Sequence, residues 1–194
     1  AVIEKGQTIG AHTLSGAIMD PIAIAELFPD GWREAGCPIE AEVGKEIVLQ
    51  LSEKKGLKFP IIPPPLKNHG NVIVTLSEVV GWLKEKVEEL EVMVFEGFAG
   101  HEFIWYGDTV AGVRTIDKGI GPDGQPGPAF EPGADILARC TVLGEGPRGS
   151  LTKLLTEKLG LHGANPQVFG TGGKEVWQLP TGRFPAGQVM HTAG

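Results

Sequence analysis

NVIVTLSEVVGWLKEKVEELEVMVFEG, residues 71–97, carries the clearest local pattern in the chain. Its first part, residues 71–76, is rich in apolar and β-branched residues, which favours a strand. From Ser77 the apolar residues return at helical spacing and charged residues cover the opposite face, so we predict an amphipathic helix with Ser77 as its N-cap. A second apolar run, residues 92–97, predicts another strand. This order of strand, helix and strand indicates a mixed α/β fold.

Further elements are predicted on both sides of this stretch. A short helix should begin at Asp20, with Pro21 in its first turn, and end near Pro29. Two apolar stretches around EKKG predict a hairpin or folded-back loop within residues 47–66. The remaining predicted elements are a hairpin over residues 102–117 that turns near Gly107, a strand over 135–146, a helix between Ser150 as its cap and Gly160 as its stop, and a strand over 174–180.

Length and composition limit the classes of protein that fit. The 194 residues suit one large domain or two small ones. A formal charge of −7 argues against general nucleic-acid binding, which needs cations to neutralise phosphates. Cys37 and Cys140 are the only cysteines, so one chain cannot supply a four-cysteine iron–sulfur site. No apolar run reaches the roughly 18 residues of a membrane-spanning helix, and no secretory signal pattern is present.

The first residues, AVIE, look like the end of a buried parallel strand that finishes on Glu4. In dinucleotide-binding folds an acid at the end of the second strand accepts a hydrogen bond from a ribose hydroxyl. The G-x-G-x-x-G turn that would come before it is absent from these residues. On this segment alone, a solvated acid near a frayed terminus is the simpler interpretation.

A second chemical signal is TVLGEGPRGSLTKLL, residues 141–155, in which an apolar strand, a glycine-acid-glycine turn and a helix start come in that order. A helix N-terminus at such a turn offers unpaired N–H groups to an anion or a ring carbonyl. An ordinary connection, in which the glycines only make the bend, explains the pattern equally well.

Taken together, six blocks resemble successive parts of the electron transfer flavoprotein-ubiquinone oxidoreductase family. They are EKGQTIGAHTLSGA (4–17), NHGNVIV (68–74), VMVFEGFAG (92–100), VLGEGPRGSL (142–151), FGTGGKEVW (169–177) and VMHTAG (189–194). The resemblance implies an interior section of a larger flavoprotein. We expect a partial FAD-binding Rossmann-like domain without its first strand and helix, residues 1–46 and 77–160, and an inserted β-rich quinone or substrate domain, residues 47–76 and 161–194.

The resemblance also implies a set of FAD contacts. Glu4 would hold the adenosine ribose, the loop from Gly10 to Gly16 would lie along the flavin side, and Phe98 would lie beside the adenine. Glu145 would approach the pyrophosphate and ribityl chain. The full set is Glu4, Lys5, Gly10, Ala11, His12, Thr13, Ser15, Gly16, Phe98, Ala99, Glu145 and Gly146. We rank a positioning role for His12 above acid–base chemistry and assign no catalytic residue. The other histidines, His69, His101, His162 and His191, show no metal-ligand spacing.

Two further sites follow from the resemblance. Gly170 and Gly172 match the turn whose backbone contacts the quinone head group, although Gly173 stands where many relatives carry a larger apolar residue. Without the resemblance, a glycine-rich turn before a strand is the preferred interpretation. An apolar tip formed by Phe59, Ile61, Ile62 and Leu66 and flanked by Lys54, Lys55, Lys58 and Lys67 would contact the bilayer. Packing of these residues on the protein's own core is an equal alternative.

The implied function is electron transfer from reduced electron transfer flavoprotein to ubiquinone, through FAD and, in the full-length protein only, a 4Fe–4S cluster. The partners would be ubiquinone, electron transfer flavoprotein and a membrane surface, with no nucleic acid. The location would be peripheral, on the cytoplasmic face of a bacterial inner membrane or on the mitochondrial inner membrane, and the isolated piece soluble and inactive. The alternatives are an FAD-dependent reductase of isoprenoid lipids and a non-catalytic module that binds a membrane or partner through residues 47–67.

Overall fold

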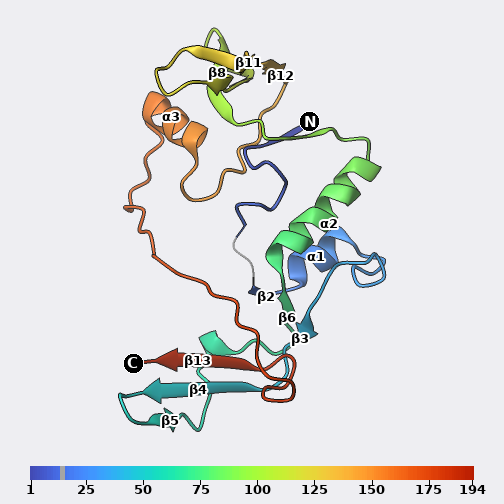
Figure 1. Cartoon of the computed structure of the whole chain (residues 1–194), viewed down its shortest axis with the longest axis vertical. Helices are drawn as coiled ribbons and strands as arrows, with labels where there is room; N and C mark the ends of the chain where they lie inside the picture. The colour runs from blue at the N-terminus through green and yellow to red at the C-terminus, as the bar shows by residue number, and fades with distance from the viewer. Residues whose placement is uncertain (14–15) are drawn as a thin grey trace. The chain divides into compact units, whose positions relative to one another are not determined.

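The computed structural model describes residues 1–13 and 16–194, which divide into two compact units. The first unit consists of Ala1–Thr8 and Val92–Thr171, and the second of Ile9–Glu91 and Gly172–Gly194. Strands are gathered in small sheets, and the described residues contain three α-helices. The predicted mixed α/β class is therefore confirmed (Figure 1).

The predicted strand and helix at the start of residues 71–97 form the centre of the second unit. Strand β6 (Val72–Val74) lies between β2 (Ala17–Met19) and β3 (Ala41–Glu42) and is antiparallel to both. Helix α2 (Leu76–Glu89) follows directly, and α1 (Ile22–Leu27) comes after β2. The Asp20 carboxylate accepts a hydrogen bond from the Ile22 N–H at 3.0 Å, but Pro21 is the N-cap residue and Ile22 the first helical residue, so the predicted helix start is wrong by one position.

The predicted N-cap of α2 is wrong. The helix begins at Leu76, so Thr75 is the N-cap residue and Ser77 lies inside the first turn. The Thr75 hydroxyl makes no capping hydrogen bond to the helix, and it donates to the Glu40 carboxylate at 2.6 Å. The sequence thus placed the helix start two residues too late, at Ser77 instead of Thr75.

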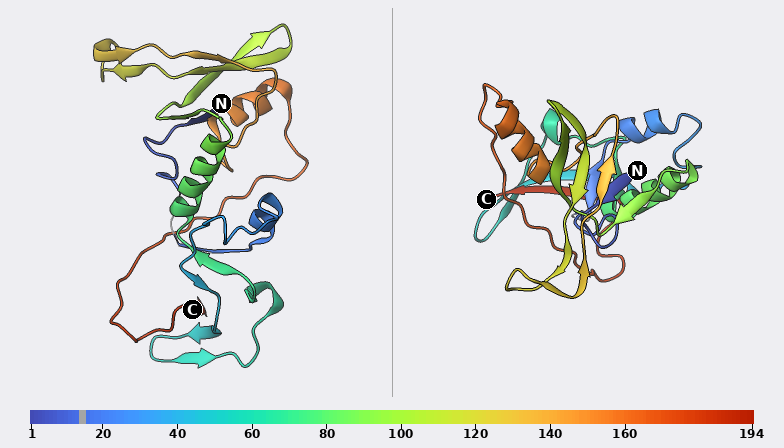
Figure 2. Two further views of the ribbon diagram at one scale, coloured as in Figure 1. Left: turned by 90° about the vertical axis from the view of Figure 1, so that its right-hand side faces the viewer. Right: turned by 90° about the horizontal axis from the view of Figure 1, so that it is seen from above.

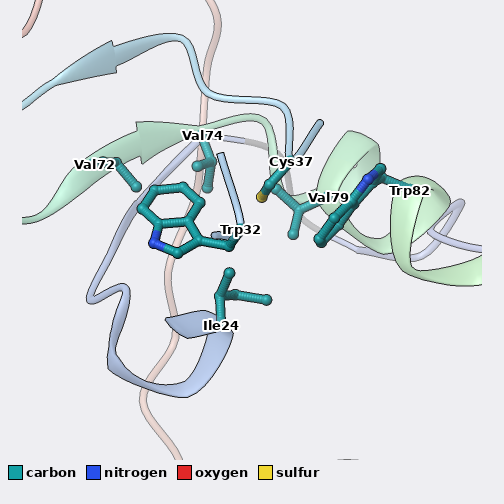
Figure 3. Close-up of a cluster of buried hydrophobic side chains, with 7 residues drawn as sticks. All are labelled: Ile24, Trp32, Cys37, Val72, Val74, Val79 and Trp82. Carbon is teal, nitrogen blue, oxygen red and sulfur yellow. The ribbon is translucent and has the colours of Figure 1, made fainter. Parts of the chain in front are cut away.

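A hydrophobic cluster fixes α1 and α2 against the sheet of β6. Its buried members are Ile24, Trp32, Cys37, Val72, Val74, Val79 and Trp82. Figure 3 shows the Trp32 ring beside the β6 valines, with Cys37 between Trp32 and Val79. The Trp82 indole N–H donates to the Ala35 carbonyl at 3.1 Å, so the ring is buried without leaving its polar atom unpaired. Burial raises the pKa of the Cys37 thiol, and the positive charge of Arg33 only partly opposes this.

A second sheet in this unit joins segments that are far apart in the sequence. Strand β4 (Glu46–Leu51) forms an antiparallel hairpin with β5 (Gly56–Lys58), as predicted, and a short 3-10 helix, η1 (Pro64–Leu66), follows. On its other side β4 pairs in parallel with β13 (Val189–Ala193) (Figure 1). Gly187 precedes β13 with a φ of 75°, and a side chain there would overlap the Glu42 carbonyl, so glycine is required.

The first unit contains a parallel pair of strands and an antiparallel sheet. Strand β1 (Val2–Glu4) is parallel to β7 (Val94–Glu96). The antiparallel sheet has the order β12 (Asp135–Leu137), β9 (Thr109–Thr115) and β8 (Gly100–Tyr106), and the hairpin of β10 (Lys118–Ile120) and β11 (Pro126–Glu131) extends from it (Figure 2). The predicted hairpin turn falls at Gly107 and Asp108, between β8 and β9.

Helix α3 (Ser150–Leu159) packs on this antiparallel sheet. Leu151 is its buried contact residue, and a side chain on Gly100 of β8 would clash with it. The Lys158 ammonium lies 3.5 Å from the centroid of the Trp105 ring, a distance at which the cation is attracted to the ring face. The helix ends at Gly160 in the left-handed conformation, with φ 63°, as the sequence predicts.

Two predicted strands differ from the structure. The strand expected over residues 135–146 ends at Leu137, and residues 174–180 form no strand although their sequence favours one. Residues 161–183 lack regular secondary structure, and every residue from 161 to 186 is exposed. The reason in both places is the same, because a strand needs a neighbouring strand to pair its backbone groups.

Candidate functional site

The acid predicted to bind a ribose stands at the end of a parallel strand pair. Glu4 is the last residue of β1 and lies opposite Glu96, the last residue of β7, so both side chains mark the same edge of the pair. The Glu4 carboxylate accepts a hydrogen bond from the Gly6 N–H at 2.6 Å, while its carbonyl accepts one from the Phe98 N–H at 2.8 Å. A half-buried carboxylate held in this way can accept further hydrogen bonds from hydroxyl groups. Lys5, the next residue, is exposed.

Phe98 and Ala99 follow β7 at the same edge. The Phe98 ring meets Phe95 edge-on, with centroids 5.9 Å apart, and the Lys118 ammonium lies 3.7 Å from its centroid. The Ala99 carbonyl accepts the Ile116 N–H at 2.9 Å, which ties this loop to the connection between β9 and β10. The Lys118 contact was not predicted, because no local signal links two residues 20 positions apart.

The turn around Glu145 differs in one chemical respect from the sequence expectation. The Glu145 carboxylate accepts the N–H groups of Leu151 at 3.1 Å and Thr152 at 2.7 Å, and also the Thr152 hydroxyl at 2.8 Å. Burial opposes ionisation of this carboxyl, but the hydrogen bonds from Thr152 and its neighbours outweigh burial and lower its pKa. The prediction of unpaired N–H groups at the start of α3 is wrong for these two residues, because Glu145 caps the helix.

The neighbours of Glu145 explain why the turn is rich in glycine. Gly146 has a φ of 70°, and a side chain there would meet nothing within 4 Å, so its backbone is open to close approach. Gly149 is buried, and a Cβ atom there would lie 2.6 Å from a Glu145 carboxylate oxygen. Ser150, predicted as the cap, is the first helical residue, and Gly149 is the N-cap residue without a side chain to offer.

Gly10 begins the loop predicted to lie along the flavin. It is in the second unit and lies next to the N-terminal end of α2. Gly10 is buried with φ 81°, and a Cβ atom would lie 2.9 Å from the Ser77 carbonyl oxygen. The Thr13 N–H donates to the Gly10 carbonyl at 2.9 Å, while Ala11 and His12 are exposed. The Gly16 carbonyl accepts a hydrogen bond from the Lys174 ammonium at 2.6 Å. Ser15 lies outside the described residues. The predicted FAD contacts are therefore divided between the two units.

The predicted quinone glycines lie in the exposed stretch without regular structure. Gly170 belongs to the first unit and Gly172 to the second. A side chain at either position would meet nothing within 4 Å among the described residues. Both backbones are accessible to a ligand carbonyl, but the described residues supply no wall of a pocket there.

The apolar tip follows the β4–β5 hairpin in the second unit. Ile61 is 76% exposed and Phe59 is 43% exposed, whereas Ile62 and Leu66 are half-buried. The four flanking lysines, Lys54, Lys55, Lys58 and Lys67, are all exposed. The arrangement presents an apolar surface beside cations, the combination suited to the interface of an anionic bilayer.

A buried polar cluster near this tip was not predicted. Glu46, at the start of β4, has a side chain that is only 8% exposed, and it accepts hydrogen bonds from Asn68 at 2.8–3.1 Å. The His191 ring nitrogen Nε2 lies 3.8 Å from the same carboxylate. Burial works against the charge, but the bonds from Asn68 and the nearby His191 outweigh it and lower the pKa of Glu46. Asn68 and His191 do fall in two of the resemblance blocks, which was the available signal.

The first unit has one further polar region, an open hollow of about 860 Å³ over the antiparallel sheet. Its ionic groups largely satisfy one another. Arg114 donates two hydrogen bonds to Asp135, at 2.6 and 2.9 Å, and a third to Glu102 at 3.1 Å. The bonds from Arg114 lower the pKa of Asp135. None of the predicted site residues that the structure describes lines this hollow.

The described residues offer neither a metal site nor a membrane-spanning helix. Residues 1–13 and 16–194 contain no group of three or more histidine, cysteine or acidic side chains arranged to hold a metal ion. No helix within the same residues is long and apolar enough to cross a membrane.

Comparison with known proteins covers the whole chain. The chain is 43% identical to a probable electron transfer flavoprotein-ubiquinone oxidoreductase of Acinetobacter baylyi. It is 42% identical to the mitochondrial electron transfer flavoprotein-ubiquinone oxidoreductases of mouse and human. The alignments include 100% of this chain but 35%, 32% and 32% of those proteins, so the chain spans about a third of the length of the curated relatives it matches. No protein-family model matches the chain. The resemblance inferred from the sequence blocks is confirmed over the whole chain.

Proposed function

We propose that this chain forms part of a membrane-associated FAD enzyme that takes electrons from reduced electron transfer flavoprotein and passes them to ubiquinone. The observation that carries the proposal is the identity of 42–43% along the entire chain to relatives with that name, in a bacterium and in mammals. Because a G-x-G-x-x-G turn is absent from these residues, we expect the chain by itself to be inactive.

The proposed FAD site uses residues at the edge of the β1–β7 pair. The residues present fit the adenosine part of the cofactor, since a half-buried acid that ends a parallel strand can accept a hydrogen bond from a ribose hydroxyl. They do not offer the pyrophosphate a free helix end at α3, because Glu145 accepts those N–H groups. Gly146, with open space beside it, remains a candidate for close backbone contact. Bound FAD would supply the redox chemistry, and these residues would orient it.

The proposal retains the Rossmann-like partial FAD domain over residues 1–46 and 77–160 and the quinone domain over residues 47–76 and 161–194. The parallel β1–β7 pair supports the first assignment, because parallel strands are joined by crossover connections in such folds. The sheet of β13, β4 and β5 supports the second. A 4Fe–4S cluster, which needs cysteine ligands, is proposed only for a longer protein.

The proposed quinone and membrane contacts lie in the second domain of this scheme. Gly170 and Gly172 would donate backbone hydrogen bonds to a quinone carbonyl. Phe59 and Ile61 would enter a membrane surface, with the neighbouring lysines at lipid phosphates and Ile62 and Leu66 following. The location would then be peripheral, on the inner membrane of a bacterium or mitochondrion.

A titration of the purified chain with FAD, followed by flavin absorbance and fluorescence, tests the cofactor site. We expect saturable binding that Glu4→Ala weakens at least tenfold, because a hydrogen bond to a charged group is worth about 1.5–3 kcal/mol. Glu53→Ala, which removes an exposed acid in the β4–β5 turn, is the matched control and should bind as the wild type does. Equal affinity of Glu4→Ala and wild type, or no binding by a chain with folded circular dichroism, would contradict the assignment.

The exposed apolar tip also favours a simpler function, a non-catalytic module that docks on a membrane. Co-sedimentation with vesicles of phosphatidylcholine and phosphatidylglycerol tests the contact common to both functions. The wild type should pellet with the vesicles and Ile61→Asp/Ile62→Asp should not. If neither protein pellets, or both do equally, the membrane contact is wrong. Binding to vesicles without any binding of FAD would favour the module.

A further inference from the structure

We propose that Asn68 and Glu46 form a clamp that sets the shape in which the apolar loop, residues 59–66, is presented to a membrane. The inference rests on the membrane contact proposed above and assigns positioning roles to two residues that make no contact with the lipid in that proposal.

Both ends of the apolar loop are attached to strand β4. At its start, the Phe59 N–H donates to the Val48 carbonyl at 2.9 Å. Just after its end, the Asn68 N–H donates to both carboxylate oxygens of Glu46, at 3.0 and 3.1 Å. Val48 and Glu46 are two positions apart on one strand, so the loop leaves the sheet and returns to nearly the same place.

Among the described residues, few other hydrogen bonds attach the loop to the sheet. Pro60, Pro63, Pro64 and Pro65 have no backbone N–H to donate. Its internal bonds are those of η1, from the Leu66 N–H to the Pro63 carbonyl at 2.9 Å and from the Lys67 N–H to the Pro64 carbonyl at 3.2 Å. Because these bonds are local, they shape the turn but do not fix it to the sheet. The contact between Asn68 and Glu46 supplies that fixation.

Asn68 carries the fixation into the loop itself. Its side-chain amide donates to Glu46 at 2.8 Å and to the Leu66 carbonyl at 3.0 Å. Glu46 is a strong anchor because its nearly buried carboxylate needs hydrogen-bond donors, and Asn68 provides both a backbone and a side-chain donor. His191 of β13 belongs to the same cluster, since its Nε2 atom lies 3.8 Å from the Glu46 carboxylate and 3.4 Å from the Asn68 side-chain nitrogen.

Preorganisation gives the clamp its effect on binding. A loop that already displays Ile61 at 76% exposure loses little conformational entropy when it enters the lipid interface. A loop released from Glu46 would have to order itself on binding, which weakens binding without changing any residue that contacts lipid.

The test uses the whole chain with a fluorescent probe at the tip. Ile61→Cys is labelled with an environment-sensitive dye in a Cys140→Ser background, where the remaining Cys37 is buried. Asn68→Ala and Glu46→Gln are then introduced separately, and Asn71→Ala serves as the matched control. Dye anisotropy in the free protein reports the mobility of the loop, and titration with phosphatidylcholine–phosphatidylglycerol vesicles reports binding. A second labelling site, Leu57→Cys on β5, precedes the loop and controls for changes in the hairpin.

We expect Asn68→Ala to lower the anisotropy at position 61 but not at position 57 and to weaken vesicle binding about tenfold. Glu46→Gln should act in the same direction, and Asn71→Ala should have neither effect. Unchanged anisotropy in both clamp variants, or a loosened loop with unchanged vesicle binding, overturns the inference. If the wild type does not bind vesicles at all, the membrane contact of the proposed function fails and the inference fails with it. Unchanged anisotropy, or a loosened loop with unchanged vesicle binding, overturns only the clamp and leaves the membrane contact intact. Because a variant that lost its fold would lower the anisotropy at both labels, the two sites separate unfolding from release of the loop.

Discussion

Strand β6 and the segment of residues 174–180 are both short runs that the sequence predicts as strands. Strand β6 reads VIV, and residues 175–179 of the other segment read EVWQL. Both sequences favour extended backbone. In the structure β6 pairs with β2 on one side and β3 on the other, and Val72 and Val74 are completely buried. In the other segment, Val176 and Trp177 are exposed, and no backbone hydrogen bond joins residues 174–179 to a strand within the described chain.

Strand propensity becomes structure only where partners meet both the backbone and the side chains. β6 gains a hydrogen-bond ladder from its two neighbours and apolar contacts from Trp32 and α2. Residues 174–180 have the same intrinsic preference and neither kind of partner among the described residues. The amino-acid pattern therefore describes what a segment could bury, while the surroundings decide whether it does.

The largest expected change in the free energy of unfolding is at Trp82, which packs in the cluster on β6, and it contrasts with Trp177 in residues 174–180. Trp82→Ala should destabilise the second unit by about 4 kcal/mol, because a buried aromatic residue leaves a cavity and an unpaired Ala35 carbonyl. Trp82 is 8% exposed, whereas Trp177 is 75% exposed. Urea unfolding followed by far-ultraviolet circular dichroism measures both variants.

Trp177→Ala is the matched control for this experiment and should change the free energy of unfolding by less than about 0.5 kcal/mol. A loss similar to that of Trp82→Ala would mean that residues 174–180 are packed in solution and that the comparison is wrong.

An intermediate effect is expected at α3, where a single side chain satisfies a helix end. Glu145→Gln should destabilise the first unit by about 1 kcal/mol, the typical contribution of a helix cap, since glutamine cannot accept as strongly from the Leu151 and Thr152 N–H groups. Thermal unfolding at pH 7 measures it. Glu157→Gln, near the other end of the same helix, is the control, and an equal effect there would exclude a specific capping role.

The cap also has a predictable pH dependence. The pKa of Glu145 is lowered in the folded chain from the ordinary 4.5, so its stabilising contribution is fully present above that pH and is lost as the pH falls through the lowered folded value. The difference in stability between wild type and Glu145→Gln should therefore be constant near neutral pH and shrink in acid. A difference that stays the same down to pH 3 would show that the carboxylate charge is not involved.

The smallest effect is expected at the exposed ion pairs of β9. Arg114→Gln removes two hydrogen bonds to Asp135 and one to Glu102, yet all three groups face solvent, and exposed ion pairs contribute little to stability. Chemical unfolding in low and high salt measures it, and the small difference should decrease further in high salt. A loss of stability larger than that of Glu145→Gln would mean that this hollow is more closed than its surface exposure indicates.

Elements with local signals could be predicted from the amino-acid order alone. Helix α2 follows from apolar residues at helical spacing, the β8–β9 hairpin from two strand-like runs around Gly107, and the end of α3 from Gly160 in the left-handed conformation. The family resemblance could also be inferred from the sequence, because its blocks stand in order along the chain. Spacing and turn chemistry act between near neighbours, so they do not depend on the rest of the molecule.

Features that depend on distant residues could be known only from the folded chain. It pairs β13 with β4 across more than 130 positions, assigns the Thr75 hydroxyl to Glu40, and makes Glu145 the cap of α3 in place of Ser150. It also buries Glu46 against Asn68 and His191 and leaves residues 174–180 without a partner strand. These features share one cause. A hydrogen-bonding group binds a partner that the fold brings within about 3 Å, and such a partner need not be a neighbour in the sequence.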